Sequence, residues 1–278
     1  MFAGLFLWIT LPSPSSRGEW LTQNEVMQIE CWNNQIASEK SGNDEFKDLD
    51  RPMIWKSLTS PVSWSFAILY LFSLTTIYGV AYFLPAIFGE MGFDDLMRNL
   101  MTVPVYLLTF FALGIVSYIA DSFIPYIPLI VILACLCTTI GYSQILVSSK
   151  YQITWLGILG ANLANIGSYS TLPVVLSWLS ASIRREFSNS STANGVAIGL
   201  VISFGSFGGV IGPQLYSIVT QRGDGSIDYF YGHLSMTICG VISVLVASII
   251  GLVQYYQSKT NYQVISSLEQ DPLLANKK

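Results

Sequence analysis

Charged residues are scarce in this chain. Only 11% of its 278 residues are Asp, Glu, Lys or Arg, against about 25% in a typical soluble domain. Hydrophobic residues make up 52% and the mean hydropathy is +0.52. A soluble protein of this length could not cover its surface with so few charges, so the composition indicates a membrane protein. Eight of the 17 acidic residues cluster before the first long apolar run, so much of the net charge of -4 belongs to one segment.

Basic clusters and catalytic motifs are also missing. The chain has no basic patch for nucleic acid, no Walker A lysine motif, no GxSxG and no HExxH. One of the four cysteines precedes the long apolar runs and three lie within them, at Cys31, Cys135, Cys137 and Cys239. This distribution favours neither a disulfide framework nor a zinc site. We therefore expect no enzyme activity, no metal, no cofactor and no nucleic-acid partner.

Long apolar runs dominate what the chain does contain. Each is close to the roughly 20 residues that a helix needs to cross a bilayer. The expected spans are 62–88, 100–120, 126–147, 153–179, 192–219 and 233–255. The sequence therefore predicts an all-α, multi-pass membrane protein whose six-helix transmembrane domain covers residues 62–256.

The flanking segments are predicted from their polarity. Residues 1–12 are apolar but too short to span, and we interpret them as the truncated end of a transmembrane helix. Residues 13–61 form a polar loop, and residues 257–278 form a polar tail that cannot build a core. Lys and Arg concentrate in that loop, in the tail and at Arg184 and Arg185. The positive-inside rule therefore places the loop and the tail in the cytoplasm.

Glycines recur at four-residue spacings in residues 195–216, GVAIGLVISFGSFGGVIGPQLY. We expect this stretch to form one spanning helix. A helix face without side chains lets a neighbouring helix approach closely in lipid. The predicted packing seam consists of Gly195, Gly199, Gly205, Gly208, Gly209 and Gly212. Whether the seam only packs or also slides is left open.

Polar side chains form a stripe on the fourth expected span. Asn162, Asn165 and Tyr169 recur at spacings of three and four residues, which places them on one face of a helix. Because amides in lipid need partners, this face must point into the bundle. Two interpretations stay open: a substrate-binding surface, or hydrogen bonds that only hold helices together.

Tyrosines on the first and second spans are further substrate-binding candidates. Tyr78 and Tyr82 are four residues apart and share a helix face, and Tyr106 follows Pro104 near the start of the second span. The alternative for such tyrosines is anchoring at the membrane interface. His233, the only histidine, begins the sixth span; we favour a hydrogen bond to a loop over a proton relay.

The order of several motifs resembles one transporter family. The matching pieces are LPSPSSRGEWLTQNE, YGVAYFLPAIF, TVPVY, SYIAD, LPVVLSW, GSFGGVIGPQLY and DYFYGH. Together they resemble the carboxyl-terminal half of a major facilitator superfamily transporter of the fungal anion:cation symporter family, which includes allantoate, pantothenate and nicotinate permeases. The resemblance implies a fold of two six-helix halves that rock about a central site, of which this chain supplies one.

The resemblance also implies a function. It favours secondary active, proton-coupled transport of a small organic anion such as a carboxylated vitamin or a ureide. The partners would be the lipid bilayer and either a separate amino-terminal half or further copies of the chain. The alternative is a non-transporting remnant or interaction protein from an interrupted reading frame.

The tail contains one more motif, an acidic dileucine pattern. Glu269, Leu273 and Leu274 fit ExxxLL, which resembles signals for endosomal or vacuolar sorting. The alternative is a disordered tail in which the match is accidental. The location is therefore expected to be the plasma membrane or an endosomal or vacuolar membrane.

Overall fold

The structure is a computed structural model that describes residues 27, 51–187, 190–217, 220–221 and 227–269. Two units are distinguished in it, Met1–Arg51 and Pro52–Lys278, and the second contains the transmembrane helices. The predictions for residues 1–12, for most of the loop 13–61, and for Leu273 and Leu274 lie outside the described residues.

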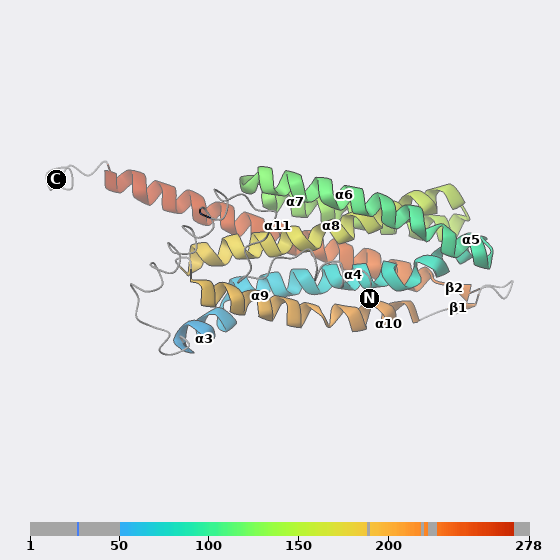
Figure 1. Cartoon of the computed structure of the whole chain (residues 1–278), viewed down its shortest axis with the longest axis horizontal. Coiled ribbons are helices and arrows are strands. Elements are labelled where there is room, and N and C mark those ends of the chain that lie inside the picture. The colour runs from blue at the N-terminus through green and yellow to red at the C-terminus, as the bar shows by residue number, and fades with distance from the viewer. Residues whose placement is uncertain (1–26, 28–50, 188–189, 218–219, 222–226, 270–278) are drawn as a thin grey trace. The chain divides into compact units, whose positions relative to one another are not determined.

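Six helical segments of the described chain are long and apolar enough to cross a bilayer (Figure 1). The prediction of an all-α membrane fold with six spans is therefore confirmed. The spans consist of α4 (Pro61–Glu90), α5 (Asp95–Leu100) with α6 (Thr102–Ser122), α7 (Ile127–Tyr151), α8 (Thr154–Glu186), α9 (Ser191–Gly205) with α10 (Gly208–Ser217), and α11 (Phe230–Glu269). A short α3 (Arg51–Thr59) precedes them, and η1 (Ile124–Tyr126) joins α6 to α7. A ladder of two-residue strands, β1 (Thr220–Gln221) and β2 (Ile227–Asp228), lies between α10 and α11.

Local signals in the sequence set the starts of two helices. The Ser60 hydroxyl accepts a hydrogen bond from the Val62 amide at 3.2 Å, and Pro61 occupies the first helical position, where its missing N–H costs nothing. Ser190 caps α9 in the same way, accepting from the Ala193 amide at 3.3 Å. These caps satisfy amides that the helices leave without a partner at their first turn.

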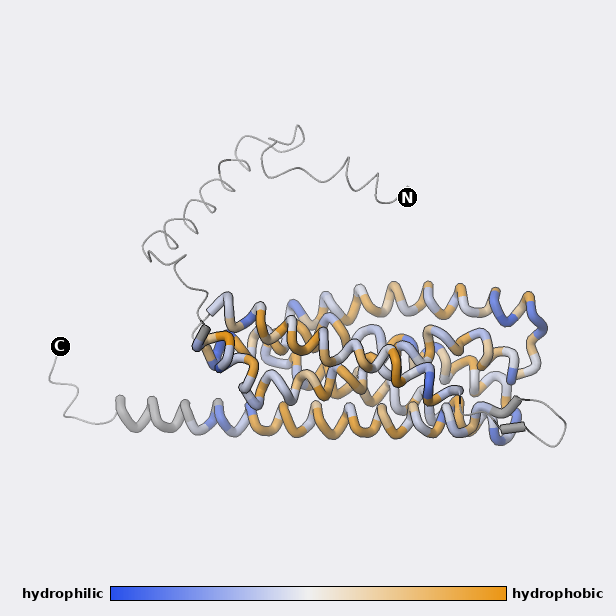
Figure 2. Tube along the Cα trace, turned by 90° about the horizontal axis from the view of Figure 1, so that it is seen from below, coloured by the Kyte–Doolittle hydropathy of each residue, from blue (hydrophilic) through white to orange (hydrophobic). Residues whose placement is uncertain are grey.

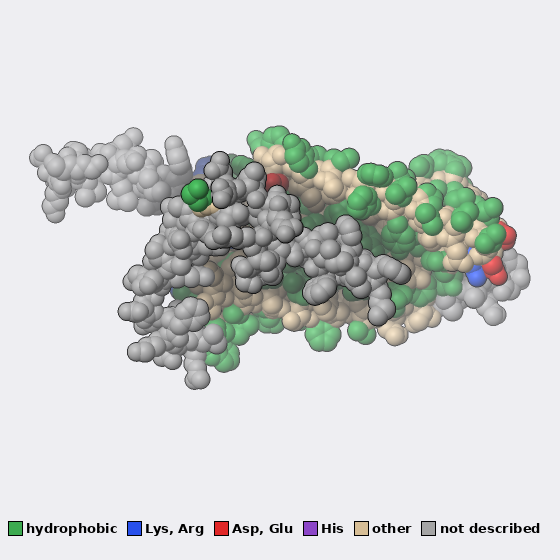
Figure 3. Space-filling view, viewed as in Figure 1, with side chains coloured by type: hydrophobic (Ala, Val, Ile, Leu, Met, Phe, Trp, Pro, Cys, Tyr) green, Lys and Arg blue, Asp and Glu red, His purple; other side chains and the backbone are tan. Residues whose placement is uncertain are grey.

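Helix α4 lies at the centre of the bundle and contacts α8, α9, α10 and α11, while α7 packs along α8 and α11. Figure 2 shows hydrophobic residues along the helices and the most hydrophilic ones mainly towards their ends. Figure 3 shows hydrophobic side chains over the described part of one face, with a group of acidic and basic side chains where α5 lies. Such an apolar exterior suits a lipid environment. The exposed side chains of α6 include Leu107, Phe110, Ile115 and Tyr118.

Two elements differ from the sequence-based expectation. The fifth span is not one helix, because it is interrupted at Ser206 and Phe207 between α9 and α10. A Gly205–Ser206 pair lies at the interruption, and Gly/Ser pairs are a known cause of helix kinks. The tail also differs, since α11 continues as a helix to Glu269, well beyond the expected span end at Tyr255.

Candidate functional site

Some glycines of the predicted seam pack against α4, whereas others face open space. A Cβ on Gly208 would lie 2.6 Å from the Leu71 carbonyl oxygen, and one on Gly212 would lie 2.6 Å from that of Thr75, both on α4. The rings of Tyr70 and Tyr78, also on α4, lie against Gly205 and Gly209. By contrast, a Cβ on Gly195 or Gly199 would meet nothing within 4 Å among the described residues beyond its own stretch of helix. The close approach to α4 therefore belongs to α10 and the end of α9.

The candidate tyrosines form two pairs. Tyr78 and Tyr82 stack along α4, with ring centroids 6.1 Å apart and an interplanar angle of 19°. Tyr106 of α6 meets Tyr169 of α8 edge to face, with centroids 6.3 Å apart and an angle of 88°. Tyr78 and Tyr169 both pack against the same hydrophobic core. Tyr82 is 65% exposed, so it lies at the outside of the unit.

The two candidate asparagines have different environments. Asn162 donates from Nδ2 to the Ile158 carbonyl of its own helix at 2.8 Å, while its Oδ1 is buried without a partner. Asn165 is fully buried, and neither its Oδ1 nor its Nδ2 has a hydrogen-bond partner. Burying an amide without a partner costs roughly 1–3 kcal/mol. The fold therefore carries at Asn165 a polar group that its own described residues do not satisfy.

A small polar cavity lies among hydroxyl groups of the helices that surround α8. The Ser168 Oγ is 3.4 Å from the Thr138 Oγ1 and 3.5 Å from the Thr76 Oγ1, which joins α8 to α7 and α4. The cavity has a volume of about 10 Å³, the size of roughly one water molecule. Its lining consists of Ser73, Thr76, Cys135, Thr138, Ser168, Thr171, Gly240 and Ser243.

A buried cluster of titratable side chains joins three helices at one end of the bundle. His233 of α11 is fully buried, and its Nε2 lies 3.1 Å from the Glu90 Oε2, whose side chain is only 5% exposed. The His233 Nδ1 lies 3.1 Å from the hydroxyl of Tyr216 on α10, which is also fully buried. Both ring nitrogens are thus engaged by helix residues, so the favoured expectation of a loop hydrogen bond for His233 was wrong.

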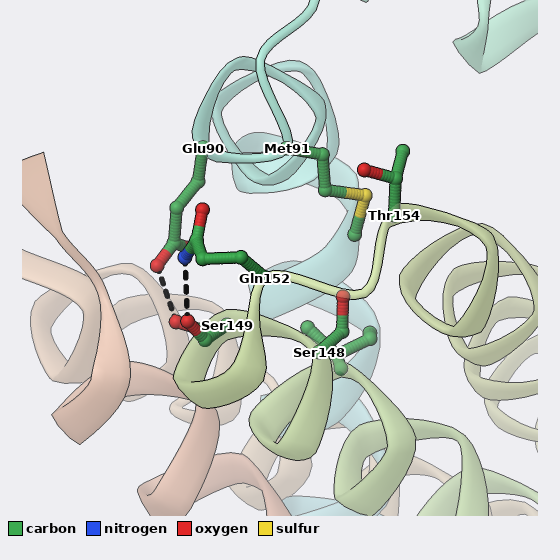
Figure 4. Close-up of a pocket in the computed structure, with 7 residues that line it drawn as sticks. Glu90, Met91, Ser148, Ser149, Gln152 and Thr154 are labelled. Atoms are coloured by element: carbon green, nitrogen blue, oxygen red, sulfur yellow. Dashed lines mark hydrogen bonds between the residues drawn. The ribbon is translucent and has the colours of Figure 1, made fainter.

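Glu90 also contacts α7. The Ser149 hydroxyl donates to its Oε1, and Gln152 donates from Nε2 to the Ser149 carbonyl at 2.7 Å (Figure 4). Gln152 has a left-handed backbone with φ of 56°, which ends α7 and turns its side chain back over the helix end. A second cavity of about 10 Å³ adjoins this carboxylate. It is lined by Glu90, Met91, Ile145, Ser148, Ser149, Gln152 and Thr154.

The opposite end of the bundle carries a separate polar network. Trp178 of α8 donates from its indole nitrogen to the Gln254 Oε1 of α11 at 2.8 Å, and the Gln254 Nε2 donates to the Ser182 hydroxyl at 2.8 Å. The Ser60 hydroxyl meets both Glu186 carboxylate oxygens at 3.0 Å. These bonds fasten α8 to α11 and to the start of α4.

Sequence reasoning missed Glu90, Tyr216 and the hydroxyl cavity as polar sites. Glu90 lies just beyond the expected span 62–88, although α4 includes it as the last residue. The sequence signal that could have identified this cluster was an acidic residue and the only histidine, each at the end of an apolar run. For the hydroxyl cavity the signal was weaker, because Ser and Thr in membrane helices often bond their own backbone, as Thr138 does to the Ala134 carbonyl at 3.1 Å.

Comparison with known proteins connects this bundle with transporters. The chain is 30% identical over 164 residues to the high-affinity nicotinic acid transporter of Saccharomyces cerevisiae, a match that covers 59% of the chain and 29% of that protein. It is 27% identical over 224 residues to an uncharacterized transporter of Schizosaccharomyces pombe, covering 77% of the chain and 41% of the relative. A fungal protein named MFS transporter prlL is 26% identical over 215 residues, covering 75% and 40%. No protein-family model matches the chain.

The fold and the relatives together define the class. The chain is an all-α, integral, multi-pass membrane protein related to fungal transporters, one of which carries the major facilitator name. Its six helices agree with half of a major facilitator bundle. The matches span 29% to 41% of the lengths of these three relatives. The relatives are named as transporters, in agreement with the expectation that the chain is not an enzyme.

Proposed function

We propose that the chain is a six-helix half of a secondary transporter of the fungal anion:cation symporter type. It cotransports a small organic anion, such as a carboxylated vitamin or a ureide, with a proton. The observation that carries this proposal is Asn165, a fully buried amide with no partner among the described residues. An amide kept unpaired in the core of a membrane bundle is costly unless a ligand or a facing protein surface satisfies it.

The tyrosine pairs support the substrate class. Tyr106 and Tyr169 offer ring edges and faces on α6 and α8, next to the polar stripe that contains Asn165. Tyr78 offers a third ring, which is only partly buried. Aromatic side chains bind planar ligands and hold a hydroxyl for hydrogen bonding. One relative is named a nicotinic acid transporter, which agrees with a planar carboxylated substrate.

The charge that neutralises the anion comes from outside this bundle. In the described span helices, the Lys and Arg residues lie in terminal turns or beyond the apolar stretch, as with Lys150 of α7 and Arg184 and Arg185 of α8. A carboxylate substrate bound near Asn165 therefore needs a cation from a second half, encoded separately, or from another copy of the chain. The glycines that face open space, Gly195 and Gly199, offer α9 as part of the surface for such a partner.

A non-transporting remnant is the competing proposal. The limited coverage of the relatives is compatible with it, since the matched region is 29% of the nicotinic acid transporter. A non-transporting remnant would gain no function from an unpaired buried amide. An apolar side chain at that position would make the bundle more stable.

An uptake experiment separates the two proposals. The chain is expressed in yeast cells alone and together with a separately expressed amino-terminal transporter half, and uptake of radiolabelled nicotinate, pantothenate and allantoate is measured at constant surface abundance. We expect saturable uptake of one of these anions, and we expect Asn165→Leu to reduce it at least tenfold without lowering abundance. Ser206→Ala is the matched control, because its hydroxyl is exposed and bonds only the Ile202 carbonyl at 2.7 Å. Absence of uptake in every combination would contradict the transporter proposal.

A further inference from the structure

The Glu90–His233–Tyr216 cluster is built to hold one additional proton. With neutral His233, the Nε2–H donates to the Glu90 carboxylate, and the Nδ1 accepts from the Tyr216 hydroxyl, each at 3.1 Å. With protonated His233, the Nε2–H still donates to Glu90, and the Nδ1–H donates to the Tyr216 oxygen once that hydroxyl has turned. Every hydrogen-bonding position of the imidazole is satisfied in both states.

The two states differ in charge but not in the positions of the heavy atoms. In the first state the cluster carries one negative charge, on Glu90, and in the second it is an ion pair with no net charge. The added proton resides on the Nδ1 of His233, and the hydroxyl proton of Tyr216 rotates away from the ring. Because each ring nitrogen of the imidazole keeps its partner in both states, His233 can take up and release a proton without losing a hydrogen bond of the ring.

Among the residues that the structure describes, the neighbouring titratable groups leave the imidazole as the proton acceptor. The other phenols that share the apolar core around Tyr216 are those of Tyr142 on α7 and Tyr229 before α11, and phenols stay neutral near physiological pH. Arg98 of α5 approaches the backbone of Gly89 but pairs with Asp95 at 3.0 Å. Lys150, next to Ser149, is exposed and lies over the ring of Tyr151 at 5.7 Å.

The cavity beside Glu90 offers room for water next to the cluster. Its volume of about 10 Å³ suits roughly one water molecule, and its polar lining includes the carboxylate itself together with Ser148, Ser149 and Gln152. The cluster lies at the end of α4 and the beginning of α11, so the path from the carboxylate to the aqueous phase is short. The same contacts join α4, α7, α10 and α11, so a change in protonation acts on four helices at once.

We infer that Glu90, His233 and Tyr216 form a proton-binding site, which supplies the coupling proton of the proposed transport. Only the coupling role of the site rests on the proposed function, because proton binding is measurable without transport. Glu90 and His233 hold the proton, and Tyr216 is a positioning residue whose hydroxyl reverses between donor and acceptor.

Nuclear magnetic resonance of the imidazole tests the site directly, because the chain has a single histidine. The full chain, with ¹⁵N-labelled histidine, is reconstituted in lipid nanodiscs, and the two ring ¹⁵N signals are followed from pH 4 to pH 9. We expect the neutral Nε2–H tautomer at high pH and reversible conversion to the imidazolium at low pH. An imidazole that stays in one state across this range would overturn the proposal.

Two variants and a control test whether the imidazole signals depend on Glu90 and Tyr216. At the pH where half of the wild-type imidazole is protonated, Glu90→Gln lowers the imidazolium fraction at least threefold, because the carboxylate no longer stabilises it. Tyr216→Phe keeps the ring packed on Phe83, 4.6 Å away, but removes the partner of the Nδ1 and moves that nitrogen's signal. Glu186→Gln removes a carboxylate that bonds Ser60 and leaves both signals unchanged. An unchanged imidazolium fraction in Glu90→Gln contradicts the site, as does an unmoved Nδ1 signal in Tyr216→Phe.

The transport assay then separates coupling from proton binding. We expect acid-stimulated uptake in the wild type and at least a fivefold loss of that stimulation in Glu90→Gln at equal surface abundance. Unchanged acid stimulation in Glu90→Gln would overturn the coupling role. Absence of uptake in every protein would count against the proposed function, whereas the proton-binding site would still stand or fall on the imidazole signals.

Discussion

Gly141 of α7 lies directly against the backbone of Ala164 in α8. A Cβ on Gly141 would lie 2.7 Å from the Ala164 Cα and 2.7 Å from the Gly160 carbonyl oxygen. Side-chain carbons do not approach a backbone this closely, so the missing side chain is what lets the two helices meet. Further along the same pair of helices, Ser168 of α8 lies 3.4 Å from the Thr138 hydroxyl of α7.

Gly141→Val will separate α7 from α8. Because the opposing atoms belong to the backbone, they cannot move aside as a flexible side chain would, and we expect a loss of about 3 kcal/mol in stability. Gly114→Val is the matched control, because a Cβ there meets nothing within 4 Å. Thermal unfolding of both purified proteins in detergent measures the difference, and equal melting temperatures would contradict the contact.

The glycines of the fifth span will separate into two groups on substitution. Gly208→Val places a side chain against the backbone of Leu71 and Thr75, and we expect it to lower stability by about 2 kcal/mol. Gly199→Val, which meets no atom of the chain within 4 Å, should leave the stability of the bundle unchanged. The melting temperatures of the two variants check this, and a similar loss in both would mean that α9 packs as closely as α10.

Gln254→Leu will weaken the attachment of α11 to α8. The substitution removes the bonds to Trp178 and Ser182, which are 2.8 Å each, and leaves the indole N–H without its acceptor. We expect a loss of about 1–2 kcal/mol, since hydrogen bonds between membrane helices contribute modestly. Gln257→Leu on the exposed side of the same helix is the control. Unfolding in increasing sodium dodecyl sulfate, followed by circular dichroism, compares the two variants.

Single cysteines will determine the orientation in the membrane. Lys56 and Lys150 are exposed at opposite ends of the bundle, the first next to the start of α4 and the second at the end of α7. In a background without the native cysteines, Lys150→Cys should react with an impermeant maleimide on intact cells, and Lys56→Cys only after the membrane is opened. The reverse pattern would place the loop before α4 outside and contradict the positive-inside assignment.

The spans could be predicted from the sequence because their signal is local. Twenty consecutive apolar residues suffice to cross a bilayer, and α4, α7 and α8 follow this signal with ends shifted by a few residues. The polar stripe of Asn162, Asn165 and Tyr169 was equally visible, since helical spacing alone decides which side chains share a face. The break in the fifth span escaped this reasoning, because glycines favour close packing and helix interruption alike.

The partners of these side chains were decided by tertiary structure alone. Asn165 is fully buried and has no hydrogen-bond partner among the described residues, whereas both polar atoms of Gln254 are paired, and nothing in their sequence surroundings distinguishes them. Glu90 and His233 are 143 residues apart, and they meet because α4 and α11 pack together at the same end of the bundle. The sequence by itself determined that six apolar helices cross a membrane, because hydrophobic length is a property of each segment. Only the packing of helices decided which polar groups meet, because each contact depends on two segments at once.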